Sequence, residues 1–132
     1  MDVRNRHKFV SAVFITFSGN CRQALTYYQT CFGGTVQFDA FDKKLQGYAD
    51  TPIISGSLIS DSIIIHGSDL VYSEGRILGN YLSIFMQCKT INQRQRLIEK
   101  LNLDKKSTVG EEVDLKLIEV TDLFDVRWIL GV

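Results

Sequence analysis

Residues 11–34 read SAVFITFSGNCRQALTYYQTCFGG, and this stretch decides the fold of the first half of the chain. Apolar residues alternate with others over residues 11–17, which predicts a strand with one face on a core. Asn20, with Gln23 three positions later, predicts a capping box at the start of a helix. Apolar side chains then recur at helical spacing until two glycines at 33–34 end the helix.

The same order of signals returns in the second half of the chain. Residues 82–86 alternate like a strand, and Thr90 with Gln93 predicts a second capping box. Thr90 lies 70 residues after Asn20, and the apolar stripes of the two predicted helices keep this offset. We interpret the chain as an internal duplication.

Further strand signals follow each predicted helix. They lie at residues 35–41, 53–60 and 62–66, with a tight turn at Asp61, and at residues 113–120 and 126–131, with a weaker strand near 107–112. Polar loops are expected at 43–51 and 68–79. Each half is therefore a βαβββ module, at about residues 9–70 and 80–131, in a single α+β domain spanning 1–132.

Two such modules side by side would form a curved mixed sheet with helices on its convex side. No helix would cover the concave side, so this hollow is the natural place for a small molecule.

Composition narrows the function classes. The chain has 132 residues, of which 45% are hydrophobic, enough for one domain with a core. Lys plus Arg and Asp plus Glu both number 15, without long blocks of one sign, so we expect neither nucleic-acid nor membrane binding. Three cysteines, an odd number, favour reduced thiols in the cytoplasm. The apolar run at 9–17 is short and alternates like a strand, so no signal peptide is expected.

Several motifs, in this order, resemble those of PhnB-like proteins of the vicinal-oxygen-chelate superfamily, which includes glyoxalases, bleomycin-resistance proteins and ring-cleaving dioxygenases. They are Phe17–Asn20, Ala24–Tyr28, Phe32–Gly34, Ile54–Leu58, Ile65–Asp69 and Thr121–Trp128. The resemblance spans nearly the whole chain and implies the paired βαβββ fold. Asp125 stands where the family usually has glycine, and aspartate tolerates the left-handed backbone angles that such a position needs.

The resemblance also implies a divalent metal held by His, Glu or Gln in the hollow. By register, the ligand positions here are Ala12 (or Val13), Ser55, Tyr81 and Ile129. Ala and Ile cannot bind a metal, and Ser and Tyr are poor ligands beside imidazole and carboxylate. We therefore expect no metal and no cofactor.

The expected function is that of a metal-free small-molecule-binding protein of this superfamily, and no catalytic residue is assigned. The alternative is a lyase, dioxygenase or transferase-like enzyme of the same superfamily with an unrecognised metal site. Some PhnB-like proteins carry a demethylubiquinone methyltransferase-like label, but no glycine-rich nucleotide loop follows a strand here to support methyl transfer.

The candidate ligand-binding side chains follow from strand alternation, which sends one set into the hollow. They are Phe14, Thr16, Ser55, Ser57, Tyr81, Ser83 and Phe85. The alternative is that these side chains fill the hollow or meet a partner subunit. His66 could donate a hydrogen bond to a ligand or act as a base, but it could also bond only to the backbone.

Arg127 shares its predicted face with Ile129 and should point into the hollow. The predicted hairpin places Glu119 opposite Arg127, so the two could form an ion pair at the ligand site or merely at the surface. A guanidinium in the hollow implies an anionic ligand. We also expect a homodimer, and among the cysteines only Cys21, at a helix N-terminus, could be activated.

Overall fold

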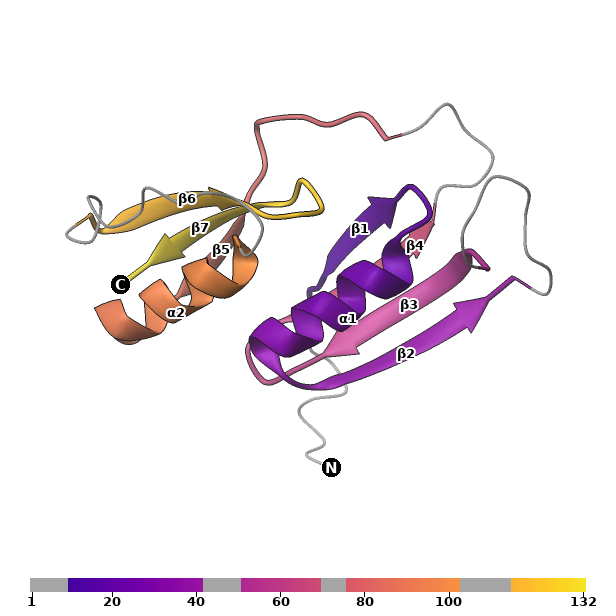
Figure 1. Cartoon of the computed structure of the whole chain (residues 1–132), viewed down its shortest axis with the longest axis horizontal. Coiled ribbons are helices and arrows are strands. Elements are labelled where there is room, and N and C mark those ends of the chain that lie inside the picture. Colours follow the sequence, from indigo (N-terminus) through magenta and orange to yellow (C-terminus); the bar gives the residue numbers. More distant parts are fainter. Residues whose placement is uncertain (1–9, 42–50, 70–75, 103–114) are drawn as a thin grey trace. The chain divides into compact units, whose positions relative to one another are not determined.

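A computed structural model describes residues 10–41, 51–69, 76–102 and 115–132. The chain divides into two compact units, Met1–Arg76 and Ile77–Val132. Within the described residues, each unit contains one helix packed on one small mixed sheet (Figure 1). That these units make up a single domain of two modules stays a prediction.

The first unit has the predicted βαβββ order. Its elements are β1 (Val13–Phe17), α1 (Cys21–Phe32), β2 (Thr35–Ala40), β3 (Ile53–Ile59) and β4 (Ile64–Asp69). The strand order in the sheet is β1-β4-β3-β2, with β1 parallel to β4 and the other pairs antiparallel. The predicted turn at Asp61 is confirmed between β3 and β4. The loop predicted from residue 68 onward is wrong at its start, because β4 continues to Asp69.

The second unit repeats this connectivity in its described part. Its elements are β5 (Ile84–Gln87), α2 (Ile91–Leu101), β6 (Leu117–Thr121) and β7 (Arg127–Gly131). The order is β5-β7-β6, with β5 parallel to β7. This matches β1, β4 and β3 of the first unit and supports the duplication. The weak strand predicted near 107–112 lies outside the described residues, and the strand predicted from residue 82 begins only at Ile84.

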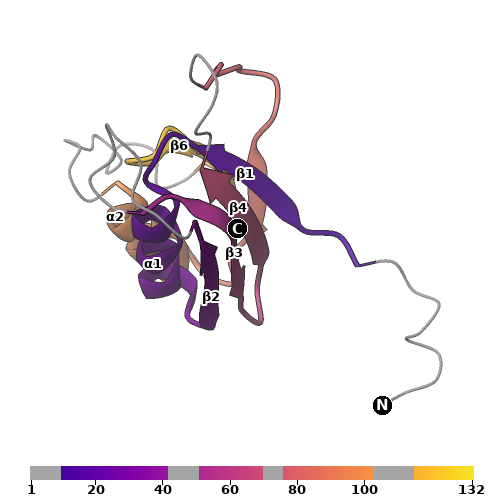
Figure 2. The ribbon, with the colours of Figure 1, turned by 90° about the vertical axis from the view of Figure 1, so that its right-hand side faces the viewer.

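Helix α1 covers one face of the first sheet, as Figure 2 shows from the side. Its buried side chains are Cys21, Ala24, Leu25 and Tyr28. Gly56 and Gly67 pair across β3 and β4 beneath it. A Cβ on Gly56 would lie 2.9 Å from the Leu25 side chain, and one on Gly67 would lie 3.1 Å from the Cys21 sulfur. Two glycines therefore let the helix approach the sheet closely.

The N-terminus of α1 is held by Asp69, not by the predicted capping box. Asn20 makes no side-chain capping bond. The Asp69 carboxylate instead accepts hydrogen bonds from the backbone N–H groups of Gly19 at 3.0 Å, Cys21 at 2.9 Å and Ile53 at 2.8 Å. Because Asp69 is only 8% exposed, these charge-assisted bonds lie in the interior of the unit.

Helix α2 begins as predicted. The Thr90 hydroxyl accepts from the Gln93 backbone N–H at 3.0 Å, while the Gln93 side chain accepts from the N–H of Lys89 at 2.6 Å. The second half of the box therefore reaches one residue further back than the usual motif. Arg94, buried on α2, donates to the carbonyls of Leu115 at 2.7 Å and Lys116 at 3.3 Å, which ties the helix to the chain before β6.

The hairpin between β6 and β7 is organised by Asp122, which is fully buried. One carboxylate oxygen accepts from the N–H groups of Phe124 at 2.8 Å and Val126 at 3.2 Å. The other accepts from the indole N–H of Trp128 at 2.8 Å. Asp125 has a φ of 64°, so the left-handed conformation predicted at this position is confirmed.

Cys21 is not an activated thiol. Burial raises its pKa to about 12, the Asp69 carboxylate adds to the rise, and Arg22 opposes it. Burial and the nearby carboxylate thus oppose the activation that a helix N-terminus could give this thiol.

We predict that Asp69→Ala lowers the free energy of unfolding by about 3 kcal/mol or more, because three backbone donors lose a buried carboxylate acceptor. Asp69→Asn should have a smaller effect, since its one remaining oxygen can still accept from Gly19 and Cys21. Urea unfolding measures both, and Asp61→Ala, at an exposed turn, is the control with an expected change below about 0.5 kcal/mol. An Asp69→Ala variant as stable as this control would contradict the role assigned to the carboxylate.

We predict that Cys31 is the thiol that reacts first with a disulfide reagent in the folded protein. Cys31 is half-buried, whereas Cys21 and Cys88 are buried and burial raises the pKa of both. Cys31→Ser should abolish the fast phase of labelling, and Cys21→Ser should leave it unchanged. Rapid labelling that disappears in Cys21→Ser would show that Cys21 is accessible.

Candidate ligand-binding face

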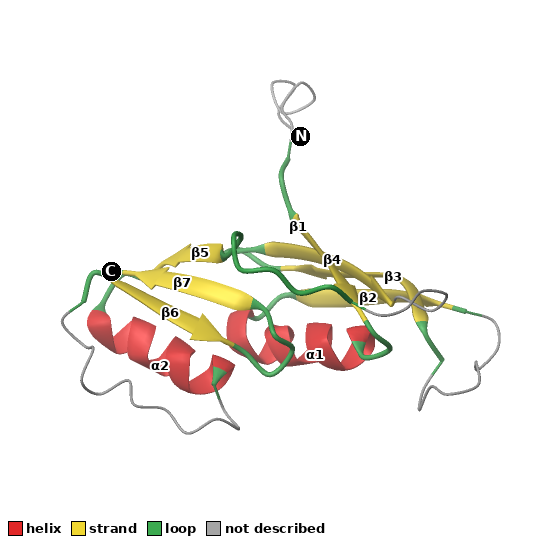
Figure 3. Ribbon diagram, turned by 90° about the horizontal axis from the view of Figure 1, so that it is seen from above, coloured by secondary structure: helices red, strands yellow, loops and turns green. Residues whose placement is uncertain are grey.

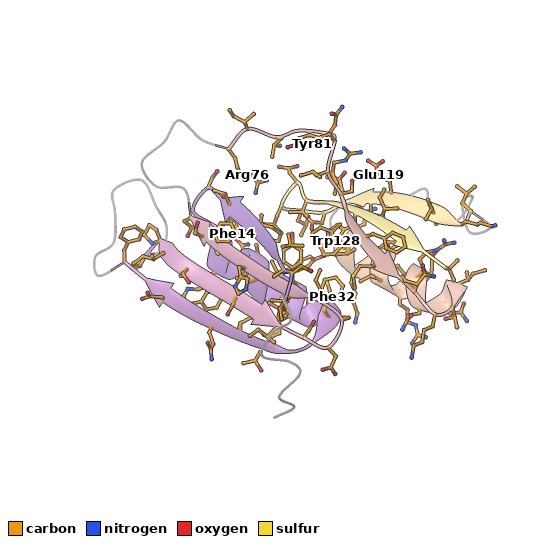
Figure 4. The ribbon with its side chains drawn as sticks, turned by 180° about the vertical axis from the view of Figure 1, so that it is seen from behind. Phe14, Phe32, Arg76, Tyr81, Glu119 and Trp128 are labelled. Atoms are coloured by element: carbon orange, nitrogen blue, oxygen red, sulfur yellow. The ribbon has the colours of Figure 1, made fainter. Side chains whose placement is uncertain are left out.

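The face of the first sheet opposite α1, here called the open face, carries residues from all four strands. In Figure 3 the helix lies on one side of this sheet, and Figure 4 looks at the other side, where Phe14 is labelled. No described element of the first unit covers it. The open face therefore presents its side chains away from the core of the unit.

One row of residues crosses the open face from strand to strand. Phe14 on β1 lies beside His66 on β4, which lies beside Ser57 on β3, which lies beside Gln37 on β2. Neighbouring strands are about 4.8 Å apart, so Phe14 and Ser57 are separated by about 10 Å. The row thus offers an aromatic ring, an imidazole, a hydroxyl and an amide within the span of a small molecule.

The sheet register brings the five predicted residues of the first unit onto this face. Thr16 and Ser55 flank the row, and Phe14 and His66 are exposed within it. His66 is therefore not buried in the core, and ligand binding by all five residues stays a prediction.

Sequence reasoning missed three polar residues of the open face, Gln37, Asp39 and Ser68. Gln37 lies opposite Ser57, Asp39 opposite Ser55, and Ser68 opposite Thr16. The alternation of residues 35–41 could have predicted that Gln37 and Asp39 lie on this face. Ser68 was missed because residue 68 was assigned to a loop.

A bulge limits the open face at the start of β3. Asp39 pairs with Ser55 and Ala40 pairs with Ile53, so Ile54 has no direct partner on β2. Strict alternation with Ser55 on the open face would bury Ile54 and expose Ile53. The structure shows the reverse, because Ile53 is fully buried and Ile54 is 46% exposed. The face of hydroxyl and aromatic groups therefore ends at Ser55.

The second unit has its own face opposite α2. Phe85 on β5, Ile129 on β7 and Glu119 on β6 form one row across it. Phe85 is 54% exposed, whereas Trp128 and Leu130, on the other face, are fully buried. Tyr81 and Ser83 precede β5 in a segment without strand structure, where Tyr81 is 84% exposed. The prediction that these two side chains project from a strand is therefore wrong, because the pairing with β7 starts only at Ile84.

Arg127 and Glu119 form the predicted ion pair, but the predicted strand register is wrong. Arg127 lies opposite Thr121, and Glu119 lies opposite Ile129, two residues further along the hairpin. The shift arises because the turn closes at the backbone pair of Asp122 and Val126, one residue further along the chain than the pair of Thr121 and Asp125 that the predicted register requires. The guanidinium reaches diagonally across the strands, with Nη2 at 2.7 Å and Nε at 3.1 Å from the same Glu119 oxygen.

The guanidinium of Arg127 also donates a hydrogen bond to the backbone. Its Nη1 donates to the carbonyl of Asn80, in the segment before β5. The side chains of Arg127 and Glu119 are 23% and 50% exposed, so water screens their interaction. Glu119 therefore balances the positive charge of Arg127. Anion binding by Arg127 stays a prediction, and the pairing with Glu119 makes it less favourable.

The residues do not fit a divalent metal of the superfamily type. Ser55 and Tyr81 are exposed, Ile129 is half-buried beside Glu119, and Ala12 precedes β1. Within the described part of the chain, no three His, Cys, Asp or Glu side chains are grouped as metal ligands. The Asp69 carboxylate lies close to His66 in sequence, but it already accepts hydrogen bonds from three backbone N–H groups.

No helix in the described ranges is both long and apolar enough to cross a membrane.

Comparison with known proteins gives a fold and a set of remote relatives. No protein-family model matches the chain. Protein YjdN of Escherichia coli is 24% identical over 136 residues, which cover 90% of this chain and 92% of YjdN.

Solved structures match over nearly the full length. The PhnB protein of Bacillus cereus, for which the name 3-demethylubiquinone-9 3-methyltransferase has been proposed, is 16% identical with a TM-score of 0.73, covering 93% of this chain and 98% of its own. A variant of the fosfomycin resistance protein FosX of Listeria monocytogenes, complexed with Mn(II) and 1S,2S-dihydroxypropylphosphonic acid, is 12% identical with a TM-score of 0.61, covering 94% and 91%. The chain thus has the α+β fold of the glyoxalase and bleomycin-resistance proteins and resembles the PhnB-like branch of the vicinal-oxygen-chelate superfamily.

Proposed function

We propose that this protein binds a small organic molecule without a metal ion, and that the open face of the first unit contacts the ligand. The supporting observation is the row of Phe14, His66, Ser57 and Gln37. This row lies on a face that no described element of its unit covers. It combines an apolar surface with several hydrogen-bonding groups, the usual make-up of a ligand site.

The exposure of Phe14 supports a partner for this face. Its side chain is 64% exposed, whereas Phe17, on the same strand but facing α1, is fully buried. Covering a phenyl ring of this kind stabilises a complex by about 1.5–3 kcal/mol. A ligand that places an apolar group on Phe14 therefore gains affinity before any polar contact is made.

The chemistry of the available donors favours binding without a metal. FosX, which shares the fold, holds a small phosphonic acid together with Mn(II). In this chain the positions that the family resemblance assigns to the metal ligands, Ala12, Ser55, Tyr81 and Ile129, offer no imidazole or carboxylate. We therefore propose that this protein binds a small ligand, as FosX does, but without a metal ion.

The proposal includes a cytoplasmic homodimer. The odd number of cysteines, three, favours reduced thiols and hence a reducing compartment. Phe14 and Ile59 on the open face and Phe85 and Leu117 on the second sheet are more than half exposed, and association would cover part of this apolar surface. A partner copy could thus enclose a ligand that one face only supports.

We predict that a thermal-shift screen finds small organic ligands but no specific divalent ion. Ligands of the open face should raise the melting temperature of the wild type and have a reduced effect on Phe14→Ala. Calorimetry with Zn, Ni, Mn and Fe(II) should show no dissociation constant in the micromolar range or below. Tight metal binding that survives replacement of His7 and His66 would contradict the proposal and favour a metal-dependent enzyme of the same fold.

We predict that the protein sediments as a dimer at micromolar concentration. Sedimentation velocity over a tenfold or wider range of concentration measures this directly. A protein that stays monomeric over the whole concentration range would contradict the dimer. A ligand would then bind the open face without a partner subunit.

A further inference from the structure

We infer that the open face of the first unit selects an aromatic carboxylate, with the ring against Phe14 and the carboxylate bound by protonated His66 and the Ser57 hydroxyl. This inference rests on the proposed function and names the chemical class of its ligand.

The order of side chains along the row sets the shape of the ligand. His66 lies between Phe14 and Ser57, with direct neighbours on both sides. A ligand whose ring covers Phe14 therefore places its next substituent over the imidazole. A carboxylate at that point can accept a bond from the imidazolium and another from the Ser57 hydroxyl, whereas a ligand without an acceptor would leave both groups unpaired.

His66 is the one side chain on the described part of the open face that is able to carry a positive charge. The residues that β1 and β3 direct to this face are Phe14, Thr16, Ser55, Ser57 and Ile59, none of which titrates near neutral pH, and the neighbours of His66 on β4 are Ile64 and Ser68. Asp39 on β2 lies opposite Ser55, away from the row that contains His66.

Arg76, an arginine in the described part of this unit, does not compete for the same role. Arg76 donates to the carbonyl of Thr16 at 3.1 Å and stacks on the Phe17 ring at 5.7 Å, and Phe17 is buried on the helix side of the sheet. In the second unit, the charge of Arg127 is matched by Glu119. An anion on the open face is thus recognised by His66.

The inference has a direct consequence for pH dependence. Imidazole side chains gain their positive charge as the pH falls through the range from about 8 to 5. A carboxylate ligand that stays ionised in this range should therefore bind more tightly at pH 5.5 than at pH 8. A neutral amide of the same shape keeps the ring contact with Phe14 and should bind equally at both pH values.

The test uses 2-naphthoate and 2-naphthamide as probes in calorimetric titrations of the full chain at pH 5.5 and pH 8. For the wild type, 2-naphthoate should bind about tenfold more tightly at the lower pH, the gain expected for one charge-assisted hydrogen bond, and 2-naphthamide should not change. His66→Gln should abolish the pH dependence while keeping the affinity for the amide. His7→Gln, which removes the other histidine of the chain, is the matched control and should behave like the wild type.

The outcomes separate this inference from the proposed function. Phe14→Ala should weaken both probes, and a melting curve of each variant shows that it is folded. If the pH dependence persists in His66→Gln, or if neither naphthyl probe binds while other compounds of the screen do, the aromatic carboxylate is wrong and the open face remains a ligand site. If Phe14→Ala and His66→Gln bind every ligand of the screen as the wild type does, both the inference and the proposed site are wrong.

Discussion

The carboxylate of Asp69 is the interaction on which the first unit depends. It lies at the end of β4 and accepts from backbone groups 16, 48 and 50 residues away, so one side chain joins the start of β3, the start of α1 and the turn after β1. Its negative charge at the N-terminus of α1 also agrees with the helix dipole. This bond set holds the start of α1 over the sheet, on the face where the alternation of the strands places the buried side chains.

The second unit repeats the topology but not the polar interactions. Its buried carboxylate, Asp122, organises a hairpin turn and the Trp128 indole, and does not hold a helix N-terminus. Helix α2 has its own Thr90 cap and is tied to the chain before β6 by Arg94, where the equivalent position of α1 is Ala24. The two sheets consequently differ in their faces: one pairs its arginine with a glutamate, and the other leaves an exposed histidine among hydroxyl groups.

Much of this architecture could be predicted from hydrophobic alternation. The pattern of residues 11–17 correctly separated Phe14 from Phe17, because a strand with one buried face must alternate. The same reasoning was wrong at Leu82, where the pattern continues beyond the pairing with β7. Alternation reports which side chains suit a core, but it does not report where backbone partners begin.

The sequence by itself determined the order of the described elements and the faces on which Phe14, His66 and Ser57 lie, since these follow from local periodicity and spacing. Only the tertiary structure decided the partners of the two buried carboxylates and the strand register across which the predicted ion pair forms. Asp69, assigned to a loop, holds α1, while Arg127 meets Glu119 diagonally across a shifted register. The physical reason is that a buried charge must find its partners in space, and those partners lie in segments whose approach is set by packing and strand pairing, which a linear pattern does not encode.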